Sequence, residues 1–456
     1  MMRTLASFAE ACGGRLQGED RSYSQVCTDT RTLERGELFV ALRGSRFNGN
    51  DFVAQAHAAG AAGAVVDAPQ VTPLAQVIVA ESQAALARAA QQWRGRFDIP
   101  VIGVAGSNGK TSTKEMTAAI LARSGACLAT RGNLNNHIGV PLTLLRLGSE
   151  HHFAVIEMGA NQSGDVAALV ELAAPTIGLI TNAGAEHLEG FGTVEAAARA
   201  EGEVVEGLPA AGTAVINADD PYAPLWRGLT RAEVVSFGMT ASASWRAEGV
   251  HCEVDAQGFK TRFTLVSPLG RAAVMLELAG RHNVMNALGA AAAAAAAGAR
   301  LEHIVAGLAA VRAVPGRLQF KRAMSGAWLI DDSYNANPSS VRAGIEVLSQ
   351  LDGNKWLVLG DMAELGDFAQ ESHAEIGAFA REHGVERLFA TGALTVGTVE
   401  SFGAGGQWFP DAQALSAALI ASANAGVRML VKGSRMNRLE RVVEALTAPA
   451  ARPRAE

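Results

Sequence analysis

Residues 101–112 read Val-Ile-Gly-Val-Ala-Gly-Ser-Asn-Gly-Lys-Thr-Ser and predict a strand, a glycine-containing turn and the start of a helix. The apolar run Ile99–Ala105, which includes a proline, is typical of a buried strand. Glycines let backbone N–H groups approach an anion closely, and the N-terminus of the next helix adds partial positive charge. The stretch therefore predicts a loop that binds phosphate.

The loop departs from the full phosphate-binding pattern GxxxxGK[ST], because Val104 stands where the first glycine is expected. Lys110 would reach the outer phosphates, and the Thr111 hydroxyl would lie beside a magnesium ion that bridges the β- and γ-phosphates. An ordinary strand, turn and helix without a ligand remains the alternative. The predicted ATP-binding residues of the loop are Gly106, Ser107, Asn108, Gly109, Lys110, Thr111 and Ser112.

Length and composition predict a globular protein of two to four domains, since the chain has 456 residues, 49% of them hydrophobic and 18% charged. A net charge of −6 with no basic block argues against binding of nucleic acid. No run approaches the roughly 20 apolar residues of a membrane span, and an acidic residue interrupts the N-terminus before a signal-peptide core could form. We expect a cytoplasmic monomer without a membrane span.

The four cysteines stand far apart, and none belongs to a CxxC or Cys/His pattern with zinc spacing. We expect reduced structural thiols. They are Cys12, Cys27, Cys127 and Cys252.

Residues 1–96 are expected to form a small α/β unit, with a turn leading into a strand over 34–42, a strand at 64–66 and helices at 52–63 and 82–96. Two polar loops at strand ends, 29–31 and 44–51, are places where α/β units bind ligands, although solvated turns are the alternative. The predicted substrate-binding residues in these loops are Thr30, Arg31, Arg46, Phe47 and Asn48.

Residues 97–314 alternate strand-like and helix-like segments, so a mostly parallel sheet with crossover helices is expected. Three apolar strands, 153–157, 176–182 and 214–220, end in polar residues. Glu157 ends the first, and His187 follows the second. Because parallel strands end at one edge of a sheet, these side chains should converge on a site near Lys110.

Residues 281–286 begin a helix that continues into the alanine tract Ala290–Ala297, whose small side chains allow close packing. His282, Asn283 and Asn286 fall in its first turns. They could contact a nucleotide or simply cap the helix.

The segment from residue 315 is expected to form a second Rossmann-like sheet, with strands at 327–332, 355–360 and 427–431. The first of these ends in Asp332, and the last leads into Lys432. The Ala-, Pro- and Arg-rich tail from Thr447 is expected to be frayed.

A series of motifs runs through nearly the whole chain in one order. They are GSNGKTS (106–112), GNLNNHIGVPLTLL (132–145), EMGANQSGD (157–165), ITNAGAEHLEGFG (180–192), GRHNVMNALGA (280–290), PGR (315–317), DDSYNANPSS (331–340), GDMAELG (360–366) and VKGSR (431–435). Together they resemble the Mur ligase family. GDMAELG, DDSYNANP and the stretch from Asp29 to Phe52 favour the members that add D-alanyl-D-alanine over those that add diaminopimelate, whose DNPR motif is absent here.

The resemblance implies an α/β protein of three domains: a UDP-sugar-binding domain (1–96), a central P-loop ATPase with a mostly parallel sheet (97–314) and a C-terminal Rossmann-like domain (315–456). It implies ATP and Mg²⁺ as cofactors and UDP-N-acetylmuramoyl-tripeptide and D-Ala-D-Ala as substrates. The tripeptide carboxylate would attack the γ-phosphate of ATP and release ADP. The dipeptide amine would then attack the acyl carbon of the resulting acyl phosphate, and phosphate would leave to give the pentapeptide precursor of peptidoglycan.

The resemblance also implies roles for individual residues. Thr111 and Glu157 would hold one Mg²⁺, and His187 a second. Asn286 would contact the adenine or ribose, and closure of the third domain would bring Arg317 and Asp332 to the nucleotide. Further substrate contacts are expected at Asn136, Asn335 and Lys432, the last on the acceptor side.

One position departs from the family. A lysine that becomes carbamylated usually stands fourteen residues after the motif histidine, where this chain has Glu201. A glutamate already carries the carboxylate that a carbamate would supply, and Mg²⁺ accepts such an oxygen. We predict that Glu201 belongs to the metal site and removes the need for CO₂. A solvated helix glutamate, or substitution by Glu203, is the alternative.

Two other function classes remain open on the sequence. One is a different amino-acid ligase of the Mur or folylpolyglutamate synthetase type, and the other is a P-loop ATPase without ligation. The latter would need neither a first-domain uridine site nor acids and an arginine from a third domain.

Overall fold

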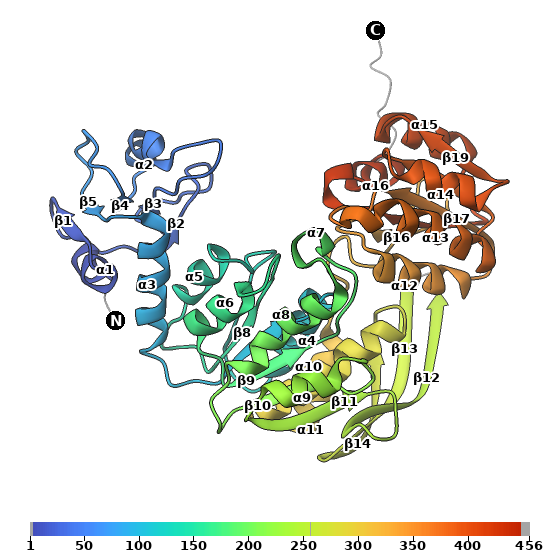
Figure 1. Ribbon diagram of the computed structural model, residues 1–456, viewed down its shortest axis with the longest axis horizontal. Coiled ribbons are helices and arrows are strands. Elements are labelled where there is room, and N and C mark those ends of the chain that lie inside the picture. The colour runs from blue at the N-terminus through green and yellow to red at the C-terminus, as the bar shows by residue number, and fades with distance from the viewer. Residues whose placement is uncertain (1–2, 256, 448–456) are drawn as a thin grey trace, which may run out of the picture.

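The computed structural model describes residues 3–255 and 257–447, and it contains three α/β units, each built on its own sheet. In Figure 1 the first unit (blue) and the third (orange to red) stand apart, on either side of the central unit. The predicted three-domain α/β class is confirmed. The tail expected to fray from Thr447 lies almost wholly outside the described residues.

The first unit has a five-stranded sheet in the order β1-β5-β4-β3-β2, antiparallel only between β1 and β5. Its strands are β1 (Arg15–Gln17), β2 (Val26–Cys27), β3 (Leu38–Val40), β4 (Gly63–Val66) and β5 (Gln76–Ile78). Its helices are α1 (Leu5–Cys12), η1 (Gly49–Phe52), α2 (Val53–Ala58) and α3 (Ser82–Arg94). Helix α3 packs against α1, α5 and α6, and so connects this unit to the next.

The central unit has a nine-stranded sheet in the order β14-β13-β12-β11-β10-β9-β6-β8-β7. All neighbours from β7 to β12 are parallel, as expected, and β13 and β14 add an antiparallel edge. Its strands are β6 (Val101–Ala105), β7 (Cys127–Ala129), β8 (Phe153–Glu157), β9 (Ile177–Ile180), β10 (Thr213–Asn217), β11 (Glu233–Gly238), β12 (Trp245–Asp255), β13 (Gly258–Ser267) and β14 (Gly270–Leu276).

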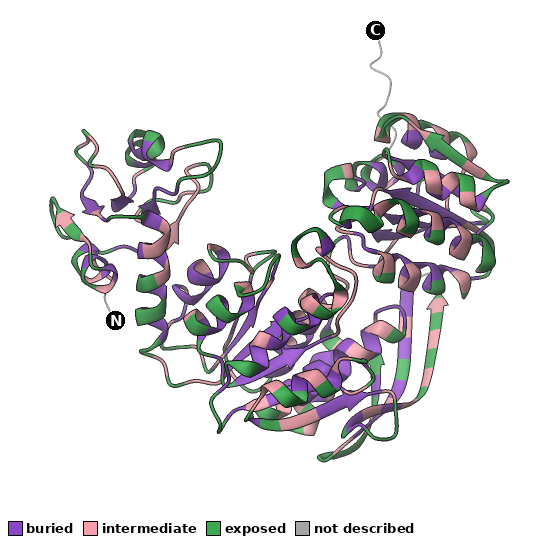
Figure 2. Ribbon diagram, viewed as in Figure 1, coloured by how far each residue is buried: buried purple, intermediate pink, exposed green. Residues whose placement is uncertain are grey.

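Helices cover both faces of this sheet, and its central strands β6, β8, β9 and β10 are buried (Figure 2). They are α4 (Lys110–Leu121), α5 (Gly139–Leu144), α6 (Asp165–Ala173), α7 (Leu188–Phe191), α8 (Val194–Glu206), α9 (Ala223–Leu229), α10 (Arg281–Ala296) and α11 (Leu301–Ala310). The alanine tract lies in α10, where Ala290–Ala294 are buried, and Gly289 lies against the Phe237 ring. The close packing expected of the tract is confirmed.

The third unit has a six-stranded sheet in the order β15-β16-β20-β17-β18-β19, parallel except between β15 and β16. Its strands are β15 (Gln319–Arg322), β16 (Trp328–Asp332), β17 (Asn354–Gly360), β18 (Arg387–Thr391), β19 (Gly406–Phe409) and β20 (Val427–Lys432). Its helices are α12 (Pro338–Ser349), η2 (Gly366–Phe368), α13 (Ala369–Glu382), α14 (Thr395–Phe402), α15 (Ala412–Ser422), η3 (Arg435–Asn437) and α16 (Glu440–Thr447).

The long β12–β13 hairpin reaches from the central sheet to the third unit (Figure 1). Phe259 of β13 is buried in the apolar core of the third unit and meets Phe320 edge to face, with the ring centroids 6.1 Å apart. Such contacts hold the carboxyl edges of the two larger sheets near one another, and the candidate site lies between them.

Two further observations concern the chain as a whole. Within the described ranges, no helix has the length and apolar character needed to cross a membrane. All four cysteines are free thiols, as expected.

Candidate active site

The phosphate loop connects β6 to α4, and two of its glycines are required by close contacts. Gly106 has φ +123° and Gly109 has φ +82°, a backbone region that other residues rarely adopt. A Cβ on Gly106 would collide with Thr181 Oγ1, and one on Gly109 would collide with the side-chain oxygen of Asn286. The predicted strand, glycine turn and helix are confirmed, and the glycines permit contact with a neighbouring strand end and a neighbouring helix.

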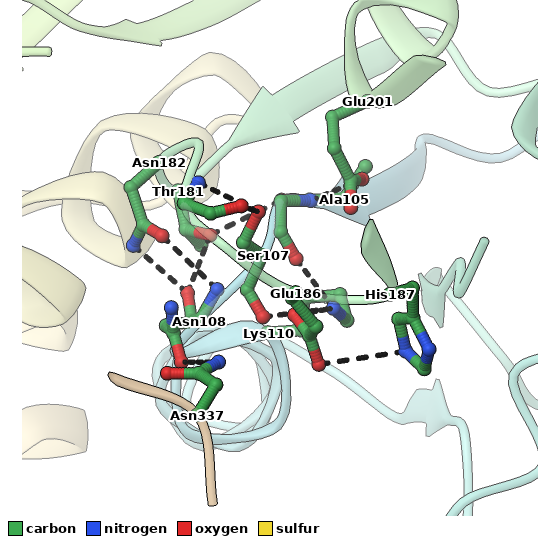
Figure 3. A network of polar contacts seen from close by, with 12 residues as sticks. Ala105, Ser107, Asn108, Lys110, Thr181, Asn182, Glu186, His187, Glu201 and Asn337 are labelled. Atoms are coloured by element: carbon green, nitrogen blue, oxygen red, sulfur yellow. Dashed lines mark hydrogen bonds and ion pairs between the residues drawn. The ribbon is translucent and has the colours of Figure 1, made fainter. Parts of the chain in front are cut away.

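The residues after β9 hold the loop in shape (Figure 3). Thr181 Oγ1 donates to the Asn108 carbonyl at 2.6 Å, and the Asn108 N–H donates to Asn182 Oδ1 at 3.0 Å. The Ser107 N–H donates to the Asn182 carbonyl at 2.9 Å. The segment that follows β9 therefore holds the loop in this conformation.

Lys110 folds back over the loop and donates to the Gly106 and Ser107 carbonyls. Burial alone would lower the pKa of Lys110, but nearby carboxylates outweigh it and raise that pKa above its ordinary value. These carboxylates belong to Glu186, Glu201 and Glu157. The lysine is thus a cation held in a site that a polyanion can enter.

Glu157, at the end of β8, lies directly beside the loop. Its Oε1 accepts hydrogen bonds from Thr111 Oγ1 at 3.2 Å and from Asn135 Nδ2 at 2.9 Å. Its Oε2 is buried and has no hydrogen-bond partner in the part of the chain that the structure describes, with Lys114 Nζ 3.9 Å away. A buried carboxylate oxygen without a hydrogen bond is costly unless a cation binds it.

His187 lies after β9, next to Glu186. His187 Nε2 is 3.6 Å from Glu186 Oε1, and Glu186 Oε2 is 3.5 Å from Lys110 Nζ. On its other side, His187 Nδ1 is 2.6 Å from Glu364 Oε2 of the third unit. Consecutive contacts through His187 and Glu186 therefore connect Glu364 of the third unit to Lys110 of the phosphate loop.

Glu201 lies on α8 with only 3% of its surface exposed, so the alternative of a solvated helix glutamate is wrong. Its Oε2 accepts a hydrogen bond from the Gly106 N–H at 2.6 Å. Burial raises the pKa of Glu201 to about 7, against the opposing effect of Lys110. Glu203, the other candidate, instead accepts hydrogen bonds from Gly164 and Ala167 at the start of α6.

A cavity of about 350 Å³ lies between the loop, α10 and the third unit. His282, Asn283 and Asn286 line it. The N-cap residue of α10 is Gly280, which has no side chain to cap the helix, and Asn283 Nδ2 donates to the Ala279 carbonyl at 2.8 Å. Burial lowers the pKa of His282 to about 4, so the ring is neutral at pH 7. Ser112 of α4 also lines the cavity, and Arg317, Asp332 and Lys432 line it from the third unit.

Lys432, which we expected on the acceptor side, lies in this larger cavity. Its Nζ donates to Asp332 Oδ2 at 2.5 Å and to the Asn335 carbonyl at 2.9 Å. Asp332 Oδ1 accepts a hydrogen bond from the Leu318 N–H at 3.1 Å. Both side chains of this pair are almost fully buried.

A smaller, more polar cavity of about 240 Å³ adjoins the first. It brings together the predicted residues Lys110, Thr111, Glu157, His187, Asn136 and Asn335. Asn108, Gly109, Arg317 and Ser340 line both cavities. The two cavities therefore meet at the phosphate loop.

The substrate residues predicted in the first unit lie elsewhere, since residues 3–96 line neither cavity. Arg31 and Phe47 are exposed, and the Arg31 guanidinium holds the pKa of Asp29 at about 2. Arg46 is exposed as well, while Thr30 and Asn48 are partly buried, and Asn48 caps η1. These loops form a separate polar surface.

Sequence reasoning missed the residues that join the central and third units. Asn337 Nδ2 donates to Asn108 Oδ1 at 2.9 Å, and Asn108 Nδ2 donates to Ser339 Oγ at 3.0 Å. Glu364 was missed as well. The residues Asn337, Ser339 and Glu364 lie in the motifs DDSYNANPSS and GDMAELG. The sequence therefore identified these motifs but not the partner of each side chain.

Within residues 3–255 and 257–447, no group of three or more His, Cys, Asp or Glu side chains forms a ready metal cage. Mg²⁺ is commonly held by one or two carboxylates together with substrate phosphates and water. The absence of a cage is therefore compatible with a magnesium site that ATP completes.

Comparisons with known proteins agree with this architecture. Three family models match the chain: the Mur ligase family, catalytic domain (residues 22–104), the Mur ligase middle domain (104–294) and the Mur ligase, glutamate ligase domain (316–435). The UDP-N-acetylmuramoyl-tripeptide–D-alanyl-D-alanine ligase of Escherichia coli is 43% identical, over 97% of this chain and 98% of the relative.

Solved structures are similar over the same length. MurF from Acinetobacter baumannii superposes with a TM-score of 0.90 at 34% identity, covering 98% of this chain and 99% of the other. MurF ligase from Thermotoga maritima, in complex with ADP, has a TM-score of 0.80 at 26% identity, covering 92% and 96%. This chain belongs to the Mur ligase family.

Proposed function

We propose that this chain is an ATP-dependent ligase that joins D-alanyl-D-alanine to UDP-N-acetylmuramoyl-tripeptide and so makes the pentapeptide precursor of peptidoglycan. The observation that carries the proposal is the meeting of the two cavities at Asn108, Gly109 and Arg317. ATP in the larger cavity would present its γ-phosphate to the smaller one, where a peptide carboxylate can approach it.

The proposed nucleotide contacts follow from this placement. Asn286 and neutral His282 line the part of the larger cavity suited to the base and ribose. Residues 106–112 supply backbone N–H groups and hydroxyls to the phosphates, with Lys110 as their cation. Arg317 and Asp332 approach the nucleotide from the third unit.

The residues present fit a magnesium ion. Glu157 offers a buried oxygen that receives no hydrogen bond from the described residues, and Thr111 lies within hydrogen-bonding distance of the same carboxylate. We assign Thr111 and Glu157 to one Mg²⁺, and His187 to a second. When bound, Mg²⁺ neutralises charge on the phosphates. Glu201, through its contact with the Gly106 N–H, remains our candidate for an additional carboxylate at this centre.

The chain's own residues then do three things. They neutralise two anions, the tripeptide carboxylate and the γ-phosphate, so that the carboxylate can attack phosphorus. Asn136 and Asn335, which line the smaller cavity, orient the peptide end and the incoming dipeptide. The Asn108–Asn337 contact keeps the third unit over the site, which excludes water from the acyl phosphate.

We assign the three domains to three tasks. Residues 1–96 would bind the UDP-sugar through the loop surface that carries Arg31, Arg46 and Phe47. Residues 97–314 would bind ATP, and residues 315–456 would close over it. The first unit's separate surface is compatible with an extended substrate whose uridine end is held far from the reacting carboxylate.

A phosphate-release assay with each substrate omitted in turn tests the proposal. We expect release only when ATP, the UDP-tripeptide and D-Ala-D-Ala are all present, and we expect Lys110→Met to abolish it. Release with single amino acids in place of the dipeptide would identify another family ligase. Steady ATP hydrolysis without either co-substrate would overturn ligation.

A further inference from the structure

The GDMAELG segment of the third unit contacts His187 of the central unit. Glu364 Oε2 lies 2.6 Å from His187 Nδ1, and the Glu189 N–H donates to the Glu364 carbonyl at 3.2 Å. Helix α7, which begins directly after His187, packs against η2, which begins directly after Leu365. The side chain and the backbone of Glu364 thus both contact the loop that carries His187.

Both partners have an unusual backbone. His187 has φ +51° and Glu364 has φ +64°, and neither is a glycine. Residues in this strained region persist where the surrounding structure imposes it, and they cluster at ligand sites and switch regions. The backbone of both loops is therefore held in the conformation that brings Glu364 to His187.

The third unit fixes the backbone on both sides of Glu364. On its N-terminal side, the Met362 N–H donates to His373 Nε2 at 2.9 Å and the Ala363 N–H donates to Ser434 Oγ at 2.8 Å. On its other side, Leu365 is buried in the apolar core. The backbone that carries Glu364 therefore moves with the third unit, while the half-exposed side chain reaches across to His187.

The contact selects one form of the histidine ring. A carboxylate oxygen 2.6 Å from Nδ1 favours the tautomer with its proton on Nδ1, because a bare Nδ1 lone pair would face a negatively charged oxygen. In the neutral ring, Nε2 is then the atom with a free lone pair. Nε2 is on the Glu186 side, 3.6 Å from a carboxylate oxygen, and His187 lines the smaller cavity.

We propose that Glu364 is a positioning residue that fixes His187 as the Nδ1–H tautomer and leaves Nε2 free to bind a divalent cation. Because Glu364 belongs to the third unit, the cation site is complete only when that unit is docked on the central one. The inference rests on the proposed role of His187 as a Mg²⁺ ligand. Carboxylates that accept from a metal-binding histidine typically change metal affinity 10- to 100-fold.

Mn²⁺ titration, followed by electron paramagnetic resonance in the presence of a non-hydrolysable ATP analogue, tests this without turnover. Glu364→Leu removes the acceptor, and we expect it to weaken one Mn²⁺ about 10- to 100-fold. Glu364→Gln keeps an accepting oxygen without the charge, so we expect a smaller loss. Asp367→Asn, at an exposed carboxylate in the same loop, serves as the control for charge and should change nothing.

Three results would overturn the inference. Wild-type Mn²⁺ binding by Glu364→Leu, with a loss in His187→Ala, would refute it while leaving the role of His187 intact. Equal losses in Glu364→Gln and Glu364→Leu would mean that charge, and not orientation, is responsible. Unchanged binding in His187→Ala would refute the histidine as a ligand, and with it this part of the proposed function.

Discussion

The carboxylate of Glu201 accepts a hydrogen bond from the Gly106 N–H across 2.6 Å and so joins helix α8 to the first glycine of the phosphate loop. In the Mur ligase family we expect a carbamylated lysine at that position. A fixed carboxylate needs no CO₂. The proposed role of Glu201 can therefore be tested by the response of the enzyme to bicarbonate.

We predict that phosphate release by the wild-type chain does not respond to bicarbonate, whereas Glu201→Lys responds strongly. A lysine must react with CO₂ before it offers a carboxylate, so only the variant should need bicarbonate. The measurement is initial rate against bicarbonate concentration at fixed pH. A large bicarbonate stimulation of the wild type would contradict the interpretation of Glu201.

Glu201→Ala should also destabilise the loop. It leaves the Gly106 N–H unpaired in a buried place, which costs about 1–3 kcal/mol in the free energy of unfolding. Urea unfolding of Glu201→Ala and Glu201→Gln measures this cost, and the glutamine variant, which keeps an accepting oxygen, should lose less. Equal losses would show that the hydrogen bond is not the source.

His282 should make stability sensitive to acid. Its folded pKa, about 4, lies below its ordinary value of 6.5 because burial disfavours the charged ring. The unfolded chain therefore binds the proton more tightly. The stability that the neutral His282 ring contributes to the folded chain is fully present above pH 6.5 and is lost as the pH falls toward 4. His282→Asn should show a smaller fall in Tm over this interval than the wild type. His251→Asn, at an exposed histidine, is the matched control.

Gly109→Ala should abolish nucleotide binding. The new Cβ would collide with the side-chain oxygen of Asn286 at a backbone φ of +82°. The loop can relieve the clash only by moving, which displaces N–H groups that we assign to phosphate. Isothermal titration with ATP measures the loss. Gly228→Ala, where a Cβ meets nothing within 4 Å, is the control and should bind normally.

The contributions of buried Lys432 and Asp332 to the free energy of unfolding should depend strongly on each other. Removing one member leaves the other charge buried and unpaired, which typically costs about 3–5 kcal/mol. We expect Lys432→Met and Asp332→Asn each to lower the free energy of unfolding by that order, and the double variant to lose less than the sum. Denaturant unfolding of all four proteins completes the cycle. Strict additivity would mean that the two side chains do not stabilise each other.

The sequence by itself determined the local features. Apolar runs, glycines and helix starts identified the phosphate loop, the strands that carry Glu157 and His187, and the alanine-rich helix, because these features depend on near neighbours and periodicity. Parallel strands end at one edge, so the convergence of those side chains near Lys110 was predictable too. The order of the motifs indicated the family.

Only the tertiary structure decided which side chain meets which. The contacts of His187 with Glu364, of Asn108 with Asn337 and of Glu201 with the Gly106 N–H join segments far apart in the chain. The placement of Lys432 beside Asp332 in the larger cavity likewise depends on the neighbouring strands β16 and β20. Such pairs are set by how sheets and loops pack, and no local pattern encodes the partner.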